Sequence, residues 1–294
     1  MAPTLRTLTG ILFLFSFLAN SPALIVGQAD GSAADPAVQG DSTLINDAFE
    51  KNSAGRSVAE FSYWHNVGTV GLGTGTYIGD GWVITAAHVG CFPFVTSAGT
   101  VWKPDYATYK VLHLAGGTYE DIAIFRLAGR PDLPAIPLAR TAFAAAEPAI
   151  IIGNGYTQEQ KSEALMLNGR AIGTLGFYTR PVRAKFWGMA YSVDSNSQVI
   201  ASRKGARTRV FATRFERKPH AAQATDGDSG SPAFIYNPDA GRWELAGCIT
   251  SVSHASRYVP YGSKSFIAPL PTAGDDAEVP VNALNFDAFE QPAI

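Results

Sequence analysis

Short apolar stretches separated by turn residues run through most of this sequence, and they restrict its fold more than any other feature. The clearest case is residues 67–85, which read VGTVGLGTGTYIGDGWVIT. Within them, the apolar stretches Gly73–Ile78 and Trp82–Thr85 flank the turn signal Gly79-Asp80-Gly81. A Gly-Asp-Gly turn between two alternating segments predicts a β-hairpin.

The same short, strand-like character recurs along the rest of the chain. It is found in Tyr109–Leu114, Ile122–Leu127, Ala149–Ile152, Arg170–Gly176, Met189–Val193, Thr208–Thr213, Ser231–Tyr236 and Glu244–Thr250. Amphipathic runs of helix length rarely separate these stretches, so the pattern predicts an all-β barrel or sandwich and not a βαβ fold. The turn-rich segment Gly153-Asn154-Gly155 divides the strands into two similar halves.

The composition limits the classes of partner. The 294 residues suffice for one large domain or two small ones. Charged residues make up only 16% and the formal net charge is −2, which argues against extensive disorder and against nucleic acid as a partner. The two cysteines, Cys91 and Cys248, define no disulfide scaffold, and their separation indicates no metal site. They are able to pair after export, but we favour two buried thiols packed as small apolar residues.

The first residues have the pattern of an export signal. Arg6 supplies a positive charge, and the apolar core Ile11–Ala19 follows. Small-residue exits lie at Ser21-Pro22-Ala23 and Gly27-Gln28-Ala29, and either is a candidate cleavage site. The core is well short of the ~20 apolar residues that a membrane span needs. We therefore expect residues 1–29 to be a signal peptide, and the processed protein to be secreted or periplasmic without stable membrane insertion.

Two further segments differ in composition from the strand-rich region. Residues 30–60 are rich in Ala, Gly, Ser, Asp and Gln, which predicts a propeptide or a flexible N-terminal arm. Residues 271–294 are acidic and rich in Pro and Ala, which predicts a C-terminal tail.

Three separate segments carry residues suited to nucleophilic catalysis. Small residues precede His88, so the chain is able to turn sharply and leave the imidazole at the end of a strand. Asp121 opens an apolar strand, where its carboxylate would accept a hydrogen bond from a histidine and fix the tautomer of the ring. Ser229 needs such a base because a serine hydroxyl is a poor nucleophile at neutral pH. Taken singly, His88 is more typical of a structural histidine and Asp121 of a solvated acid.

The loop around the serine is the most specific of the three segments. Residues 226–232 read DGDSGSP. Glycine on both sides of Asp228 and Ser229 permits backbone conformations that other residues resist. Such a loop can aim the amides of Gly227 and Ser229 at one point, which predicts an oxyanion hole for the negative oxygen of a tetrahedral intermediate.

The stretches GTGTYIGDGWVITAAH, DIAIFRL and GDSGSP resemble the histidine, aspartate and serine motifs of the chymotrypsin/trypsin family, in that family's order. The resemblance covers about residues 61–270. It implies two six-stranded antiparallel β-barrels, residues 61–155 with His88 and Asp121 and residues 156–270 with Ser229, and an active site in the cleft between them. It also implies a bacterial-style secreted serine endopeptidase that cleaves proteins or peptides through an acyl-enzyme. We expect a monomer that needs neither a metal nor an organic cofactor.

The resemblance also implies the substrate-binding residues, which are Gln223, Ala224, Thr250, Ser251, Val252 and Ser253. Thr250 would lie near Asp121 and support it. The base of the specificity pocket, six residues before the serine, is Gln223 and not an acid. This predicts a neutral pocket for small or medium apolar side chains. The seven Arg or Lys residues between Arg203 and Lys218 predict a solvated basic face or a secondary site for acidic substrates.

One departure from the family concerns the acid before the serine. In many members, cleavage frees an Ile-Val-Gly-Gly terminus whose amine pairs with that acid, which is Asp228 in this chain. Ile25-Val26-Gly27-Gln28 resembles such a terminus, but it abuts the signal core and lies 63 residues before His88. We therefore assign it to the end of the signal region. Asp228 then needs another partner, because a buried unpaired charge is costly.

Two other functions share parts of this pattern. A catalytically silent, protease-like binding protein would have the same fold, but such proteins normally lose one of the three catalytic residues, and all three are present here. A periplasmic quality-control protease of the Deg type usually has Gly-Asn-Ser-Gly-Gly at the nucleophile and a peptide-binding domain after the protease. The residues here are Gly227-Asp228-Ser229-Gly230-Ser231, and little chain follows residue 270.

Overall fold

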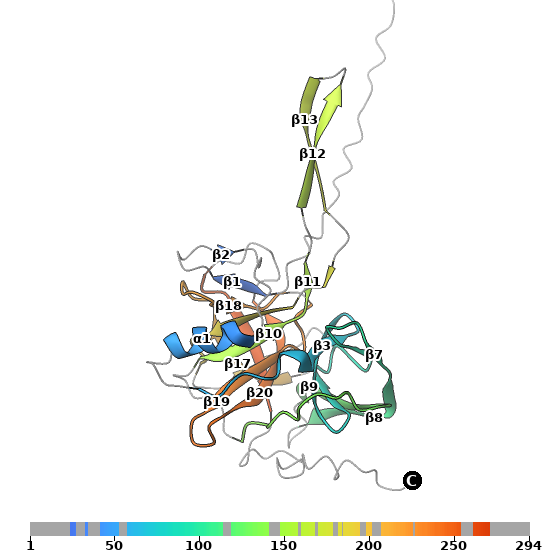
Figure 1. Ribbon diagram of the computed structural model, residues 1–294, viewed down its shortest axis with the longest axis vertical. Coiled ribbons are helices and arrows are strands. Elements are labelled where there is room, and N and C mark those ends of the chain that lie inside the picture. Colours follow the sequence, from blue (N-terminus) through green and yellow to red (C-terminus); the bar gives the residue numbers. More distant parts are fainter. Residues whose placement is uncertain are drawn as a thin grey trace, which may run out of the picture.

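The computed structural model describes most of the strand-rich region (Figure 1). The described residues are 24–27, 33–34, 42–52, 58–113, 119–140, 148–157, 160–167, 170–178, 182–183, 185–194, 198–201, 207–225, 227–253 and 261–270. The predicted tail, residues 271–294, lies outside them, as do residues 1–23 of the predicted signal peptide.

Two antiparallel sheets of seven strands each form the body of the protein. The first has the strand order β7-β6-β3-β4-β5-β9-β8. Its strands are β3 (Val67–Val70), β4 (Gly73–Gly79), β5 (Trp82–Thr85), β6 (Phe94–Val95), β7 (Val101–Trp102), β8 (Pro104–His113) and β9 (Tyr119–Leu127). The predicted hairpin is β4 and β5, and Asp80 and Gly81 between them have φ values of 49° and 85°, which the Gly-Asp-Gly turn tolerates.

The second sheet has the order β15-β10-β19-β20-β21-β17-β16. Its strands are β10 (Ala149–Gly153), β15 (Phe186–Ala190), β16 (Gln198–Ala201), β17 (Arg207–Arg214), β19 (Pro232–Asn237), β20 (Arg242–Val252) and β21 (Lys264–Pro269). Since β10 pairs with β15 and β19, the change from first to second sheet comes before residue 149, ahead of the predicted break at residues 153–155.

The prediction of an all-β, two-part fold is confirmed, although the sheets have seven strands where barrels of six were expected. Among the described residues, one isolated bridge joins Val193, just after β15, to Thr213 of β17. In the strand order, β15 is one edge of the second sheet, and β17 lies next to β16 at the other edge. The bridge therefore links the two ends of the sheet by a single contact and not by a continuous ladder.

Smaller strand pairs surround the two sheets. The three-stranded group β18-β1-β2 consists of β18 (Ala222–Gln223), β1 (Ile25–Gly27) and β2 (Ala33–Ala34). A further pair is β11 (Tyr156–Thr157) with β14 (Val182–Arg183). The hairpin of β12 (Gln160–Leu167) and β13 (Arg170–Tyr178) projects away from both sheets (Figure 1).

The described residues also include two short helices, α1 (Ser42–Asn52) and η1 (Trp64–Asn66). Within the segment predicted as a propeptide or arm, α1 buries Ile45 and Phe49, and the Phe49 ring packs edge-on against Trp243 at 4.6 Å. Burying a side chain of this size contributes about 2–3 kcal/mol. Neither these helices nor any other in the described part of the chain is long and apolar enough to cross a membrane.

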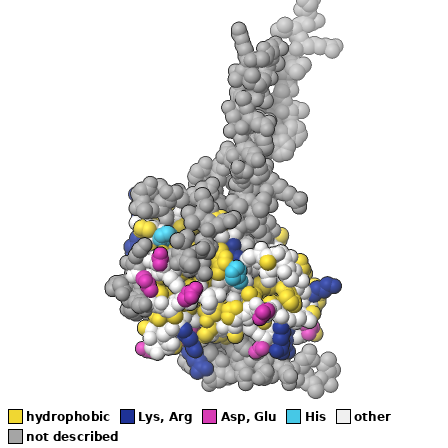
Figure 2. All heavy atoms as spheres, in the orientation of Figure 1, with side chains coloured by type: hydrophobic (Ala, Val, Ile, Leu, Met, Phe, Trp, Pro, Cys, Tyr) yellow, Lys and Arg dark blue, Asp and Glu magenta, His cyan; other side chains and the backbone are white. Residues whose placement is uncertain are grey.

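Apolar side chains of the two sheets meet in one continuous core, which includes Ile84 and Ile124 of the first sheet and Ile150 and Phe234 of the second. On the face shown in Figure 2, hydrophobic, acidic and basic side chains are interspersed, in keeping with the net charge of −2. The shared core holds the two sheets side by side, so residues at their boundary have fixed positions.

Candidate active site

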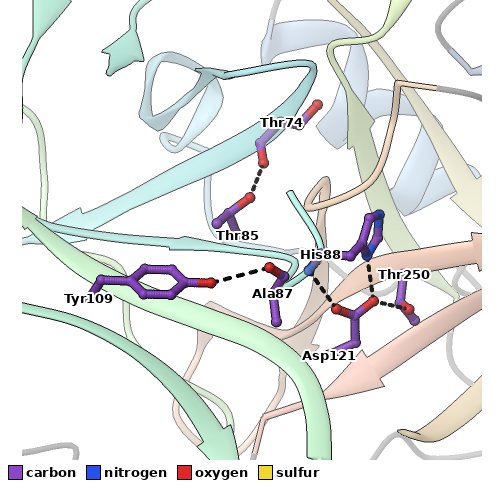
Figure 3. Close-up of polar contacts among 7 residues, drawn as sticks. All are labelled: Thr74, Thr85, Ala87, His88, Tyr109, Asp121 and Thr250. Atoms are coloured by element: carbon purple, nitrogen blue, oxygen red, sulfur yellow. Dashed lines mark hydrogen bonds and ion pairs between the residues drawn. The ribbon is translucent and has the colours of Figure 1, made fainter. Parts of the chain in front are cut away.

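Adjacent strands of the first sheet bring His88 and Asp121 together. In the antiparallel pair β5 and β9, Thr85 lies opposite Ala123, so the turn after β5 reaches the beginning of β9. His88 Nδ1 lies 2.6 Å from Asp121 Oδ2, and the backbone amide of His88 donates to Asp121 Oδ1 at 2.9 Å (Figure 3). Both carboxylate oxygens therefore hold the same residue, one through its ring and the other through its backbone.

The second sheet supplies a further hydrogen bond to this carboxylate. Thr250 of β20 donates its hydroxyl to Asp121 Oδ2 at 2.5 Å, as the family resemblance implies (Figure 3). The Asp121 side chain is only 12% exposed, whereas that of His88 is 44% exposed. A carboxylate on the Nδ1 side makes Nδ1 the proton donor of the neutral ring, so Nε2 is left as the basic nitrogen.

Two more hydrogen bonds fix the turn that carries the histidine (Figure 3). Tyr109 of β8 donates its hydroxyl to the carbonyl of Ala87 at 3.2 Å. Thr85 donates its hydroxyl to the carbonyl of Thr74 in β4 at 2.7 Å. Sequence analysis did not identify Tyr109 or Thr74, because nothing local to either residue indicates which loop it contacts.

The Ser229 loop connects β18 to β19 and turns tightly. Gly227 and Gly230 have φ values of 91° and 87°, in the region that favours glycine. The amide of Ser231 donates to the carbonyl of Asp228 at 2.8 Å, and the amide of Gly230 donates to the carbonyl of Ile249 in β20 at 2.7 Å. The glycines of the GDSG motif thus allow the conformation that the sequence predicts.

This loop docks on the first sheet beside the histidine turn. The amide of Thr74 donates to the carbonyl of Ser229 at 2.8 Å. A Cβ on Gly230 would lie 2.1 Å from the Thr74 carbonyl oxygen and 3.0 Å from the amide nitrogen of Ala86, two residues before His88. A Cβ on Gly73 would lie 2.7 Å from the Ser229 carbonyl oxygen and 2.6 Å from the Val89 side chain, one residue after His88. The Ser229 loop and the turn that carries His88 therefore lie against each other at the boundary between the sheets.

The Asp228 carboxylate accepts a hydrogen bond from the amide of Leu24, the residue directly before the segment that resembles an activation terminus. It is fully buried, and its Oδ2 accepts the amides of Leu24 and Thr225, each at 2.9 Å. Burial raises the pKa of Asp228 to about 6, although these hydrogen bonds oppose that shift. Leu24 is also fully buried, and the Ile25–Gln223 and Val26–Ala222 pairings join β1 to the strand that enters the Ser229 loop.

The predicted substrate-binding residues divide into two groups. Gln223 is fully buried and donates to the carbonyls of Ala224 and Lys264 at 3.1 and 3.0 Å, and the amide of Ala224 donates to Ser265 Oγ. These two residues are thus held by the second sheet. Ser251, Val252 and Ser253 are half-buried or exposed at the end of β20, directly after Thr250.

Both cysteines are free thiols. Burial raises the pKa of Cys91 to about 11, so its thiolate is scarce at neutral pH. Cys248 is buried in β20, and burial together with the negative charges of Asp121 and Glu120 raises its pKa. Cys248 therefore matches the interpretation as a buried thiol, whereas Cys91 is only partly buried.

Part of the predicted basic face points inward. Arg209 Nε lies 3.1 Å from Glu120 Oε1, and the Arg209 side chain is only 19% exposed. Lys218 Nζ pairs with Glu216 Oε2 at 2.7 Å. At Arg209 the prediction of a solvated basic face is wrong, because a buried carboxylate on the other sheet holds this guanidinium.

Comparisons with known proteins place the chain in a family. The family model described as "Trypsin-like peptidase domain" matches residues 73–243. No curated protein matches the chain. Among solved structures, the murine norovirus NS6 protease is 16% identical, with 72% of this chain and 95% of that chain covered and a TM-score of 0.43. An inactive serine-to-alanine mutant of Rv3671c from M. tuberculosis is 15% identical, with 89% and 100% covered and a TM-score of 0.43. Since the family model spans more than half of the residues, the chain belongs to the trypsin-like peptidase domain family.

Proposed function

We propose that the protein is a serine endopeptidase in which His88, Asp121 and Ser229 form the catalytic triad. One observation carries the proposal: the Asp121–His88 pair lies beside a GDSG loop whose serine carbonyl is bonded to the same sheet as the histidine. Ser229 Oγ would attack the peptide carbonyl while His88 Nε2 takes its proton. The same nitrogen then protonates the departing amine, which leaves an acyl-enzyme that water hydrolyses.

The backbone of the Ser229 loop supports an oxyanion hole. Among the described residues, the amides of Gly227 and Ser229 donate no hydrogen bond to the protein, whereas those of Asp228, Gly230 and Ser231 each do. Two free amides on one tight loop are suited to bind the oxygen that becomes negative in the transition state. Removing one such donor typically slows acyl transfer by a factor of about 100 to 1,000.

Labelling with a fluorophosphonate probe tests this function. We expect an adduct on Ser229 in the wild-type protein and loss of labelling in His88→Ala. The matched control is His65→Ala, because His65 is an exposed histidine in η1 outside the site. A folded, processed wild-type protein that takes up no probe would contradict the enzymatic proposal and favour a silent binding protein.

The substrates proposed are proteins or peptides with a small or medium apolar side chain at the scissile bond. Gln223 supports a neutral pocket base, because its amide is occupied by two backbone carbonyls and carries no charge. Mapping cleavage positions in a peptide library tests the preference. Cleavage mainly after Lys or Arg would contradict it while leaving the peptidase activity established.

We further propose that the protein is exported, and that the signal is removed between Ala23 and Leu24. Leu24 has a φ of 39°, a conformation in which the preceding carbonyl crowds the side chain of a non-glycine residue. Cleavage at this bond removes that carbonyl. It also converts the amide 2.9 Å from Asp228 into an ammonium group, which satisfies a buried carboxylate better than a neutral donor does.

N-terminal sequencing of the exported protein tests this position, and Leu24 is the expected first residue. A terminus at Asp30, after the second candidate site, would contradict the proposal. Cyanate modification supplies a second readout, because an ammonium buried against Asp228 should react only after unfolding. Rapid modification in the folded protein would show that the terminus is exposed.

A further inference from the structure

We propose that Glu120 and Arg209 form a positioning pair that sets the orientation of Asp121 toward His88. The inference rests on the proposed function, since it assigns a role in supporting the same triad. Glu120 directly precedes Asp121 in β9 and is fully buried. Arg209 lies in β17 of the other sheet, 89 residues along the chain, and donates from Nε to Glu120 Oε1 at 3.1 Å.

The pair gives the beginning of β9 two attachments to the second sheet. Glu120 and Asp121 are neighbours in β9, at a register shift between β8 and β9 that interrupts the regular ladder. Asp121 is bonded to Thr250 of β20, and Glu120 to Arg209 of β17. Strand β21 separates β20 from β17 in the sheet, and β9 packs against all three.

Two attachments to different strands of the second sheet resist a rotation of β9 about its own axis. A single bond through Thr250 would leave that rotation less restrained, and the rotation would swing the Asp121 carboxylate relative to the imidazole. The hydrogen bond between His88 Nδ1 and Asp121 Oδ2 is 2.6 Å long and depends on direction. A small rotation of the carboxylate is therefore enough to disrupt it. A displacement of about 1 Å is enough to slow catalysis roughly 100-fold.

Charge explains why the second attachment contains an arginine. Glu120 and Asp121 together place two negative charges in one buried environment, and both charges act on the Cys248 thiol. The Arg209 guanidinium offsets one of these charges and supplies a directional donor. Without a cation beside it, the buried Glu120 carboxylate would be an uncompensated charge, which is costly.

Three variants separate positioning from simple stability. Glu120→Gln keeps an oxygen that accepts the Arg209 hydrogen bond, whereas Glu120→Ala removes it. In the double variant Glu120→Met/Arg209→Met an apolar pair replaces the ion pair, an exchange that often leaves stability unchanged. The control is Asp80→Asn/Arg130→Met, which removes an exposed ion pair within the first sheet. Each protein is assayed for kcat and KM on a peptide taken from the library and for its urea midpoint.

We expect Glu120→Gln and the control to stay within about 3-fold of the wild-type kcat. Glu120→Ala and the double variant should lose about 10-fold or more in kcat with KM within about 2-fold, even where the urea midpoint is unchanged. A wild-type kcat in folded Glu120→Ala or in the double variant would overturn the inference. A wild-type protein that takes up no fluorophosphonate would instead overturn the proposed function, so the two failures are distinguishable.

Discussion

At the scale of single residues, the Ser229 loop depends on one position where a side chain has no room. A methyl group on Gly230 would overlap the Thr74 carbonyl oxygen at 2.1 Å, and its φ of 87° is unfavourable for any other residue. We expect Gly230→Ala to lower the free energy of unfolding by about 3 kcal/mol or more and to abolish fluorophosphonate labelling. Urea unfolding and the labelling rate measure both effects.

Gly262→Ala is the matched control for that substitution. Gly262 has a φ of 91°, but no atom of the described residues lies within 4 Å of the Cβ that it would gain. The control therefore introduces backbone strain alone, which costs about 1–2 kcal/mol. If the two variants lose the same stability, the close approach of the loop to Thr74 is not what requires glycine at position 230.

A second residue-scale prediction concerns the hydroxyl that supports Asp121. Thr250→Val removes a donor 2.5 Å from Oδ2 with little change of shape, whereas Thr250→Ser keeps it. We expect Val to slow labelling by about 10-fold and Ser to stay near wild type, because a hydrogen bond to a charged group contributes about 1.5–3 kcal/mol. Equal rates in both variants would show that Thr250 does not position the carboxylate.

Sequence predicted the site only where the information is local. His88, Asp121 and Ser229 each lie in a short motif whose neighbours permit the required turn. The structure joins His88 to Asp121 and docks the Ser229 loop on the sheet that carries both. The contacts that support them join residues far apart in the chain. Leu24 and Asp228 are separated by 204 residues, and Glu120 and Arg209 by 89. The resemblance of residues 25–28 to an activation terminus pointed toward the first pair, although we assigned that segment to the signal region. No local pattern reveals the second pair.

At the scale of secondary-structure elements, one buried lysine links η1 to the beginning of β15. Lys185 donates to the carbonyl of Trp64 at 2.8 Å and lies 4.9 Å over its ring, and burial lowers its pKa from 10.5 to about 7. Between these two values the unfolded chain binds a proton that the folded chain does not. Stability should therefore rise with pH in this window, by about 1 kcal/mol per pH unit from this group.

Lys185→Met removes that contribution, since methionine does not titrate. The difference in unfolding free energy, wild type minus variant, should increase between pH 7 and pH 9, because all other groups are common to the two proteins. Urea unfolding at both pH values measures it. A constant difference would show that Lys185 stays protonated in the folded protein, held by the carbonyl and the aromatic ring.

Strand predictions succeeded where alternation and turn residues occur together. Strand β5 agrees with the predicted Trp82–Thr85, and β10 differs from Ala149–Ile152 by one residue. The missed elements have weaker local signals, and they include α1, β12, β16 and β21. Helix α1 illustrates the reason, because the Phe49 ring is buried against Trp243, a contact across nearly two hundred residues that composition does not reveal.

At the scale of the whole molecule, Asp228 should make the free energy of unfolding depend on whether the chain has been cleaved between Ala23 and Leu24. Its pKa is raised from 3.8 to about 6 where Leu24 offers only an amide. In that window the folded state of the uncut chain holds a proton that the unfolded state has lost. Relative to Asp228→Asn, the uncut chain should therefore lose up to about 3 kcal/mol as pH rises from about 4 to about 6, and no more above that.

The chain that begins at Leu24 should show a smaller loss, since its ammonium group favours the carboxylate. Urea unfolding at pH 4, 5, 6 and 7 compares the cut and uncut proteins, each with its Asp228→Asn counterpart. Asp239→Asn, which alters an exposed loop acid, serves as the control. Identical pH profiles for cut and uncut protein would argue that the new terminus does not approach Asp228.

The hydrogen bond from the Thr74 amide to the Ser229 carbonyl joins the Ser229 loop to the opposite half of the molecule. Neither half could then assemble the site by itself. Labelling of Ser229 by the probe should therefore report whether the two halves are docked. Mild conditions that separate the halves should abolish labelling before either half unfolds.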